Sequence, residues 1–139
     1  MTPLIKSTML AVLLTITGSN AAPLRAEEAA AISENAARLV QFSTRDKLAD
    51  LAAERRTVVF FYATWCPNCI LTLSELSERW AEIDPGITLV IADYDREKAL
   101  KAEYGVTYQD TFVLLDAKAA PVRLWNAGGV AGLNRNAGS

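Results

Sequence analysis

Three short runs of consecutive apolar residues limit what this chain can fold into more than any other feature. They span residues 57–63 (TVVFFYA), 87–92 (ITLVIA) and 111–115 (TFVLL), and most of their members are β-branched or aromatic. Runs of this kind are typical of strands that are buried on both faces, which requires helices on both sides of the sheet. We therefore expect the three runs to form the centre of a sheet covered by helices.

Helical patterns separate these runs. From Pro67 onward, apolar residues recur every three or four positions, which predicts an amphipathic helix. The positions expected to face the core are Ile70, Leu73, Leu76, Trp80 and Ile83. A second, charged helix is expected over residues 95–104, closed by Gly105, because glycine readily adopts the conformation that ends a helix.

The two ends of the pattern complete the order of elements. Residues 39–42 suggest a short strand, and Ser43 or Thr44 is suited to cap a following helix. The apolar positions of that helix are Leu48, Leu51 and Ala52. A last strand at 122–125 follows the third run closely, so the two are expected to be antiparallel. The order β-α-β-α-β-α-β-β predicts an α/β domain with a central mixed sheet of four to five strands flanked by helices.

Composition excludes several classes of function. The chain has 139 residues, enough for one domain with a single core. Fourteen basic and sixteen acidic residues give a net charge of −2, so no basic excess favours a nucleic-acid partner. The sequence contains no histidine, which removes the commonest general base and the commonest zinc ligand.

The first residues resemble an export signal. Lys6 precedes the apolar run 8–16 (TMLAVLLTI), and small residues follow it. This pattern predicts a secretory signal peptide over residues 1–22, with cleavage as late as residue 26. Residues 23–37 are then a helical or frayed leader. We expect the mature protein to be exported to the periplasm or the extracellular space, with membrane anchoring through an uncleaved signal as the alternative.

Cys66 and Cys69 are the two cysteines of the chain, and Pro67 and Asn68 separate them. A disulfide across two residues closes too short a loop to stabilise the fold much, so the pair needs a chemical explanation. The first expected run ends at residue 63 and a helix is expected to begin at Pro67, which places Cys66 at a helix N-terminus. Helix dipoles favour a negative charge there, and the thiolate is the nucleophile of disulfide exchange. Cys69, almost one turn deeper, is predicted to be the resolving thiol.

The segments FFYATWCPNC (60–69) and YGVTYQDTFVLLD (104–116) resemble the thioredoxin family, specifically its exported thioredoxin-like members. The resemblance implies a thioredoxin-like domain over residues 38–129 and thiol–disulfide oxidoreductase activity without a bound cofactor or metal. It implies that Cys66 and Cys69 are the catalytic pair that forms the redox-active disulfide. The surrounding active-site residues would be Trp65, Pro67, Asn68, Asp110 and Thr111.

Four positions depart from the family pattern. Asp110 stands before Thr111, where the family normally has a cis-proline, so we expect a trans bond between Gln109 and Asp110. Phe60 occupies the place of a buried acid found beneath the site of many thioredoxins. Ser74 replaces a helix-kinking proline, and the family's C-terminal helix is expected to be weak or missing, which leaves residues 130–139 as a weakly ordered tail.

Asp110 has three possible roles at this stage. The first is that of an ordinary exposed loop carboxylate. In the second, its charge lies close to Cys66 and opposes formation of the thiolate. In the third, a partly desolvated Asp110 holds a proton and acts as an acid or base in exchange.

These observations predict an exported enzyme that exchanges disulfides with protein substrates, the reducing direction being favoured. A reductant outside the cytoplasm needs electrons from a membrane-bound or exported redox partner, and we expect the protein itself to be a monomer. The alternative function is metal binding by the two thiolates together with Asp110. A third hypothesis, an adaptor with idle cysteines, does not explain the intact Trp-Cys-Pro-Asn-Cys motif.

Overall fold

The structure is a computed structural model that describes residues 36–138. The predicted signal peptide, its cleavage region and nearly all of the predicted leader lie outside these residues. The elements are β1 (Arg38–Gln41), α2 (Arg45–Glu54), β2 (Arg56–Tyr62), α3 (Pro67–Glu78), the short 3-10 helix η1 (Trp80–Glu82), β3 (Ile87–Asp93), α4 (Lys98–Tyr104), β4 (Thr111–Leu115), β5 (Pro121–Asn126) and α5 (Gly129–Ala137).

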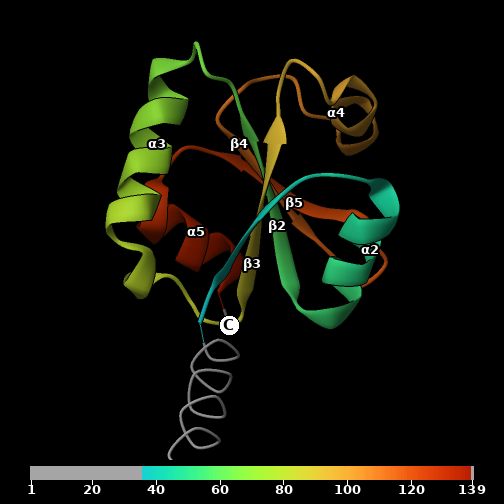
Figure 1. Ribbon diagram of the computed structural model, residues 1–139, viewed down its shortest axis with the longest axis horizontal. Helices are drawn as coiled ribbons and strands as arrows, with labels where there is room; N and C mark the ends of the chain where they lie inside the picture. Colours follow the sequence, from blue (N-terminus) through green and yellow to red (C-terminus); the bar gives the residue numbers. More distant parts are fainter. Residues whose placement is uncertain (1–35, 139) are drawn as a thin grey trace, which may run out of the picture.

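The five strands form one mixed sheet in the order β1-β3-β2-β4-β5 (Figure 1). β1 and β2 both run parallel to β3, whereas β4 is antiparallel to β2 and to β5. The three apolar runs are the central strands β2, β3 and β4, as their composition predicts. The prediction of an α/β fold with a parallel first part and an antiparallel edge is therefore confirmed.

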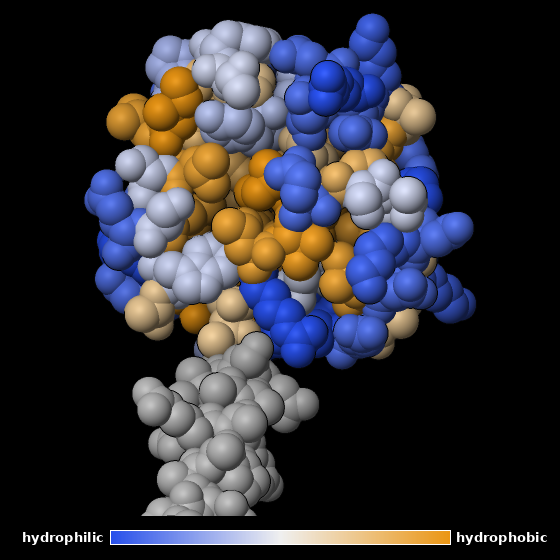
Figure 2. Space-filling view, viewed as in Figure 1, coloured by the Kyte–Doolittle hydropathy of each residue, from blue (hydrophilic) through white to orange (hydrophobic). Residues whose placement is uncertain are grey.

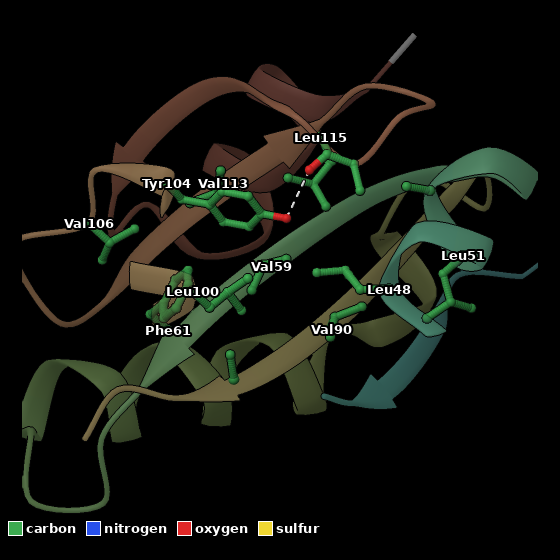
Figure 3. Close-up of a cluster of buried hydrophobic side chains, with 13 residues drawn as sticks. Leu48, Leu51, Val59, Phe61, Val90, Leu100, Tyr104, Val106, Val113 and Leu115 are labelled. Atoms are coloured by element: carbon green, nitrogen blue, oxygen red, sulfur yellow. Dashed lines mark hydrogen bonds between the residues drawn. The ribbon is translucent and has the colours of Figure 1, made fainter. Parts of the chain in front are cut away.

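Helices cover both faces of the sheet, with α3 and α5 on one side and α2 and α4 on the other (Figure 1). Each side has its own apolar core. The core under α2 and α4 contains Leu48, Val59, Leu100 and Tyr104, and the Tyr104 hydroxyl donates to the Ala119 carbonyl oxygen at 2.9 Å (Figure 3). The other core lies under α3 and α5 and includes both cysteines. The sheet thus separates the cysteines from the core that α2 and α4 cover.

Local signals place two helix ends as predicted. The Thr44 hydroxyl caps α2 by accepting the Lys47 amide proton at 3.2 Å, which satisfies a donor that has no partner within the helix. Gly105 ends α4 with φ +68°, a conformation that is costly for residues with a side chain. Leu48, Leu51 and Ala52 are buried on α2, as their spacing predicts.

The predicted apolar face of α3 is partly wrong. The buried residues of this helix are Cys69, Thr72 and Leu76, and Ile70 is exposed. The helix ends at Glu78, so Trp80 belongs to η1 and Ile83 follows it. The orientation of α3 is set by Cys69, which packs into the core with Leu76, and this turns Ile70 outward.

The C-terminal segment also corrects the prediction, because residues Gly129–Ala137 form α5 instead of a weakly ordered tail. Val130, Leu133 and Ala137 are buried at helical spacing. Tertiary hydrogen bonds hold both ends of the helix: the Val130 amide donates to a Glu75 carboxylate oxygen at 3.2 Å, and the Asn134 side-chain amide donates to the Glu82 carbonyl at 2.7 Å. Glycine and asparagine lower helix propensity, and these contacts offset that loss.

The surface is mixed in character. On the face in Figure 2, hydrophobic side chains gather near the middle, where the edge strand β1 lies towards the viewer in Figure 1, and more hydrophilic side chains surround them. Leu39 of β1 is one of the exposed large apolar residues. Among residues 36–138, no helix has the length and apolar character needed to span a bilayer.

Candidate active site

The candidate site lies where β2 ends and the chain enters α3 (Figure 1). Cys66 is the N-cap residue of α3 and Pro67 is its first helical residue, a position where proline loses no helical hydrogen bond. The Cys66 amide donates to the Ala63 carbonyl at 3.1 Å, and the Cys66 carbonyl accepts from the Ile70 amide at 3.1 Å. These bonds fix Cys66 between strand and helix, as the sequence predicts.

The two cysteine side chains are brought together by the first turn of α3. The Cys66 Sγ accepts a hydrogen bond from the Cys69 backbone amide at 3.2 Å, and both residues are free thiols. Cys66 is 3% exposed and Cys69 is fully buried, so Cys69 is the deeper of the two. The sulfur of Cys66 therefore lies just beneath the surface and meets a peptide donor, which favours negative charge on it.

The environment of Cys69 strongly favours its protonated form. Burial is the main cause that raises the pKa of Cys69 to about 12, and the hydrogen bond with Cys66 adds to the effect. The charges of Cys66 and Asp110 raise this pKa further, whereas a hydrogen bond with the Ala63 backbone lowers it. Cys69 is consequently protonated at neutral pH and ionises only when a base accepts its proton.

Asp110 is buried, so the first of its three possible roles, an exposed loop carboxylate, is wrong. It is 5% exposed, and its Oδ1 has no hydrogen-bond partner among the described residues. Burial raises the pKa of the Asp110 carboxyl, while a hydrogen bond from Thr72 lowers it. The charge of Asp110 in turn raises the pKa of the Cys69 thiol.

The backbone of Asp110 is held in an unusual conformation with φ +60°. Its amide donates to the Phe61 carbonyl and its carbonyl accepts from the Ala127 amide, both at 3.1 Å. No peptide bond in residues 36–138 is cis, so the predicted trans bond between Gln109 and Asp110 is confirmed. Aspartate and asparagine tolerate the left-handed region better than most residues, which explains how Asp110 makes this turn.

The other predicted site residues have different surroundings. Trp65, which directly precedes Cys66 in the sequence, is exposed. Its Nε1 donates to the Asp95 carboxylate at 2.7 Å, and this bond fixes the orientation of the ring. Pro67 and Asn68 are exposed on the first turn of α3. Thr111 is buried, and its hydroxyl donates to the Tyr108 carbonyl at 2.7 Å. Thr111 therefore braces the loop before β4.

Comparison with known proteins identifies the family. The sequence profile of the thioredoxin family, described as "Thioredoxin", matches residues 35–134. The chain belongs to the thioredoxin family. It is 29% identical over 65 residues to Thioredoxin-T of Drosophila melanogaster, a match that spans 47% of this chain and only 41% of that protein's length.

Solved thioredoxin structures share the fold. Trxlp from Edwardsiella tarda superposes with a TM-score of 0.60 at 21% identity, covering 73% of this chain and 99% of that one. Mitochondrial thioredoxin 3 of Saccharomyces cerevisiae, in its oxidised form, gives a TM-score of 0.60 at 22% identity, covering 71% and 92%. These similarities confirm the thioredoxin-like fold that the sequence predicts.

The departures from the thioredoxin pattern meet near the cysteines. Phe60, in the place of the family's buried acid, stacks on Phe112 with ring centroids 4.3 Å apart, and Phe112 stacks on Trp125 at 5.4 Å. The part of β2 beneath the site is thus an aromatic layer. The buried carboxyl of this site comes instead from Asp110, at the position of the family's cis-proline.

Sequence reasoning missed Thr72, the residue that links α3 to Asp110. Thr72 is buried one turn after Cys69 and hydrogen-bonds the Asp110 carboxyl. Thr72 lies three residues after Cys69 and therefore on the same face of the helix. A prediction that placed Cys69 on the buried face, instead of the aliphatic residues, would have found it. Asp95 was also missed, because a charged helix was expected to begin there, whereas α4 begins at Lys98.

The metal-binding alternative finds no support in the geometry of the described residues. Within the part of the chain that the structure describes, no three histidine, cysteine, aspartate or glutamate side chains are grouped so that they could hold a metal ion. Cys66, Cys69 and Asp110, the ligands that this alternative requires, do not form such a group.

Proposed function

We propose that this protein is an exported thiol–disulfide oxidoreductase that reduces protein disulfides through its Cys-Pro-Asn-Cys motif. The observation that carries the proposal is the hydrogen bond from the Cys69 amide to the Cys66 Sγ at the start of α3. It stabilises a thiolate at Cys66, the less buried of the two sulfurs. The Cys69 side chain in turn hydrogen-bonds Cys66, so the second thiol lies within reach of the first.

In the proposed reaction, the Cys66 thiolate attacks a substrate disulfide and forms a mixed disulfide. Cys69 then attacks the Cys66 sulfur, the bond between Cys66 and the substrate breaks, and the substrate leaves as a dithiol. The protein ends the cycle with a disulfide between Cys66 and Cys69 and has given two electrons to the substrate.

The charge distribution favours the reducing direction. An oxidant of this fold needs strong stabilisation of the thiolate, which lowers the tendency to donate electrons. The whole chain has no histidine that could add positive charge beside Cys66 and stabilise its thiolate strongly. We expect a reduction potential nearer the thioredoxin value, about −270 mV, than the strongly oxidising value of about −120 mV.

The proposed location follows from the N-terminal sequence, with its cationic start and apolar run. In the periplasm or outside the cell, the oxidised protein must regain electrons from a membrane-bound or exported redox partner. Expression with the native N-terminus, followed by fractionation and mass measurement of the mature chain, tests export. Recovery of the uncleaved protein from the cytosol would contradict it. Light scattering tests the expected monomer.

Two matched variants test the chemistry. The wild-type protein should reduce a disulfide-bonded model protein with dithiothreitol as electron source, and Cys66→Ser should abolish turnover. Cys69→Ser should form a mixed disulfide with the substrate that persists, visible as an increase in intact mass. Unchanged turnover in Cys66→Ser would overturn the proposed function. Equilibration with glutathione buffers gives the potential, and a value near −120 mV would overturn the reducing direction.

A further inference from the structure

The buried carboxyl of Asp110 is the feature that the proposed exchange reaction does not yet use. A carboxyl group buried without a partner for one oxygen costs free energy, and such costs concentrate at functional sites. Asp110 has this arrangement, because Oδ1 is buried and lacks a hydrogen-bond partner among residues 36–138. Its left-handed backbone is a second local cost at the same residue.

The surroundings of Asp110 direct this carboxyl toward the cysteine helix. From α3 it interacts with Thr72 by a hydrogen bond and with Cys69 by charge. The backbone of Asp110, and not its carboxyl, bonds to β2 and to the segment after β5, through the Phe61 carbonyl and the Ala127 amide. Among the described residues, Cys69 is the titratable group on which the charge of Asp110 acts.

The second step of exchange needs a proton acceptor at this place. Cys69 attacks only as a thiolate, and a thiol with a pKa of about 12 is ionised in about one molecule in 10⁵ at neutral pH. Bulk water has little access to Cys69, which is fully buried. A neighbouring base that takes the proton during attack removes this obstacle.

We propose that the Asp110 carboxylate accepts the proton of the Cys69 thiol as Cys69 attacks the mixed disulfide at Cys66. This inference rests on the proposed function. The Cys69 sulfur forms a bond with the Cys66 sulfur, and the bond from Cys66 to the substrate sulfur breaks. The substrate leaves as a thiolate, which takes up a proton from Asp110 or from solvent. Atoms and charge balance, and the two electrons of the new disulfide have passed to the substrate.

Thr72 is the positioning residue in this scheme. Since Oδ1 has no partner, the hydrogen bond from Thr72 reaches the other carboxyl oxygen, and Oδ1 remains without a competing donor. The same bond lowers the pKa of Asp110 and so opposes the effect of burial. Thr72 thereby keeps a larger fraction of Asp110 in the charged form that can accept a proton.

Stopped-flow reaction with an aromatic disulfide of the dithiobis-nitrobenzoate type separates the two steps. Attack by Cys66 releases one coloured thiolate, and attack by Cys69 releases the second. The wild-type protein should show two phases and Cys69→Ser only the first. Failure of the wild type to react, or the same reaction in Cys66→Ser, would reject the proposed function itself and is distinct from the outcomes below.

Asp110→Asn decides the further inference, because asparagine has the same shape and tolerates the left-handed backbone. The first phase should stay within about twofold of wild type, and the second should slow by about 10²-fold, the lower range for general base catalysis. A purely electrostatic role makes the opposite prediction. Removal of the charge would lower the pKa of Cys69 and speed the second phase. A second phase that is unchanged or faster would therefore overturn the proposal.

Thr72 variants give an independent test if Asp110→Asn fails to fold. In Thr72→Val, loss of the hydroxyl raises the pKa of Asp110, so the second phase should reach half its maximal rate at a higher pH. Thr72→Ser should restore the wild-type profile. Asp50→Asn, the same chemical change at an exposed position of α2, should alter neither phase. Identical pH profiles for the valine and serine variants would overturn the proposal.

Discussion

Replacing Leu133 with alanine tests whether α5 belongs to the core of the protein. Leu133 is fully buried and lies in the same apolar cluster as Leu76 and the two cysteines. Leucine-to-alanine changes at such positions remove transfer free energy and leave a cavity, and they lower unfolding free energy by about 3–4 kcal/mol. A loss of about 3 kcal/mol is about a 150-fold change in the ratio of folded to unfolded protein.

The loss is large for a domain of this size. The described part contains about one hundred residues, for which 1 kcal/mol corresponds to about 4–8 °C in melting temperature. Leu133→Ala should therefore melt roughly 12–30 °C below the wild type. Urea denaturation followed by tryptophan fluorescence measures the free energy, because Trp80 and Trp125 pack against the same cluster.

Leu71→Ala is the matched control, since Leu71 lies on α3 but is 68% exposed. The same side-chain truncation there should change the unfolding free energy by no more than about 0.5 kcal/mol. If Leu133→Ala cost less than about 1 kcal/mol, or if the two variants behaved alike, α5 would not be packed as described. The assignment of the C-terminal segment to the core would then be wrong.

Three further changes probe single features of the fold and site. Gly129→Ala should cost about 2–3 kcal/mol, because φ is +51° and the new Cβ would push the Glu75 carboxylate away from the Val130 amide that it accepts from. Gly105→Ala, at φ +68° with open space, should cost only about 1 kcal/mol, and equal losses in thermal unfolding would contradict this contact. Thr44→Ala should lower the unfolding free energy measured by urea denaturation by about 1 kcal/mol, whereas Thr44→Ser, which keeps the capping hydroxyl, should change it very little. Equal losses in the two variants would contradict the role of the hydroxyl as a helix cap. Burial raises the pKa of Asp110 above its ordinary value of 3.8. Between the pKa of the unfolded chain and the higher pKa of the folded protein, the folded state therefore holds more protons than the unfolded state. The stability of wild type relative to Asp110→Asn should therefore fall as pH rises through this interval, and a difference independent of pH would contradict the burial.

Much of the fold could be predicted from short stretches of sequence. β2, β3 and β4 coincide with the three apolar runs to within a residue or two, because strands buried on both faces have little choice of composition. The Thr44 cap and the Gly105 helix end are likewise local, since each depends on atoms within a few residues. The position of Cys66 at the start of α3 follows from the same local signals.

The C-terminal helix could not be predicted in this way. Its glycines and asparagines favour irregular structure in isolation, and its helical form depends on the fit of Leu133 into a core built from distant strands and on Glu75 and Glu82 at its ends. The predicted orientation of α3 was wrong for a related reason. Ile70 is as apolar as a core residue, yet the buried Cys69 leaves it facing outward.

Local chemistry, then, dictated the strands, the caps and the nucleophilic position of Cys66, because dihedral preferences and helix dipoles act over a few residues. Contacts between remote segments dictated α5, the burial of Asp110 and the high pKa of Cys69. Each of these depends on desolvation and on partners such as Thr72 that only the folded chain brings together. A carboxylate in a loop has the same sequence signature whether it is exposed or enclosed, and packing alone distinguishes the two.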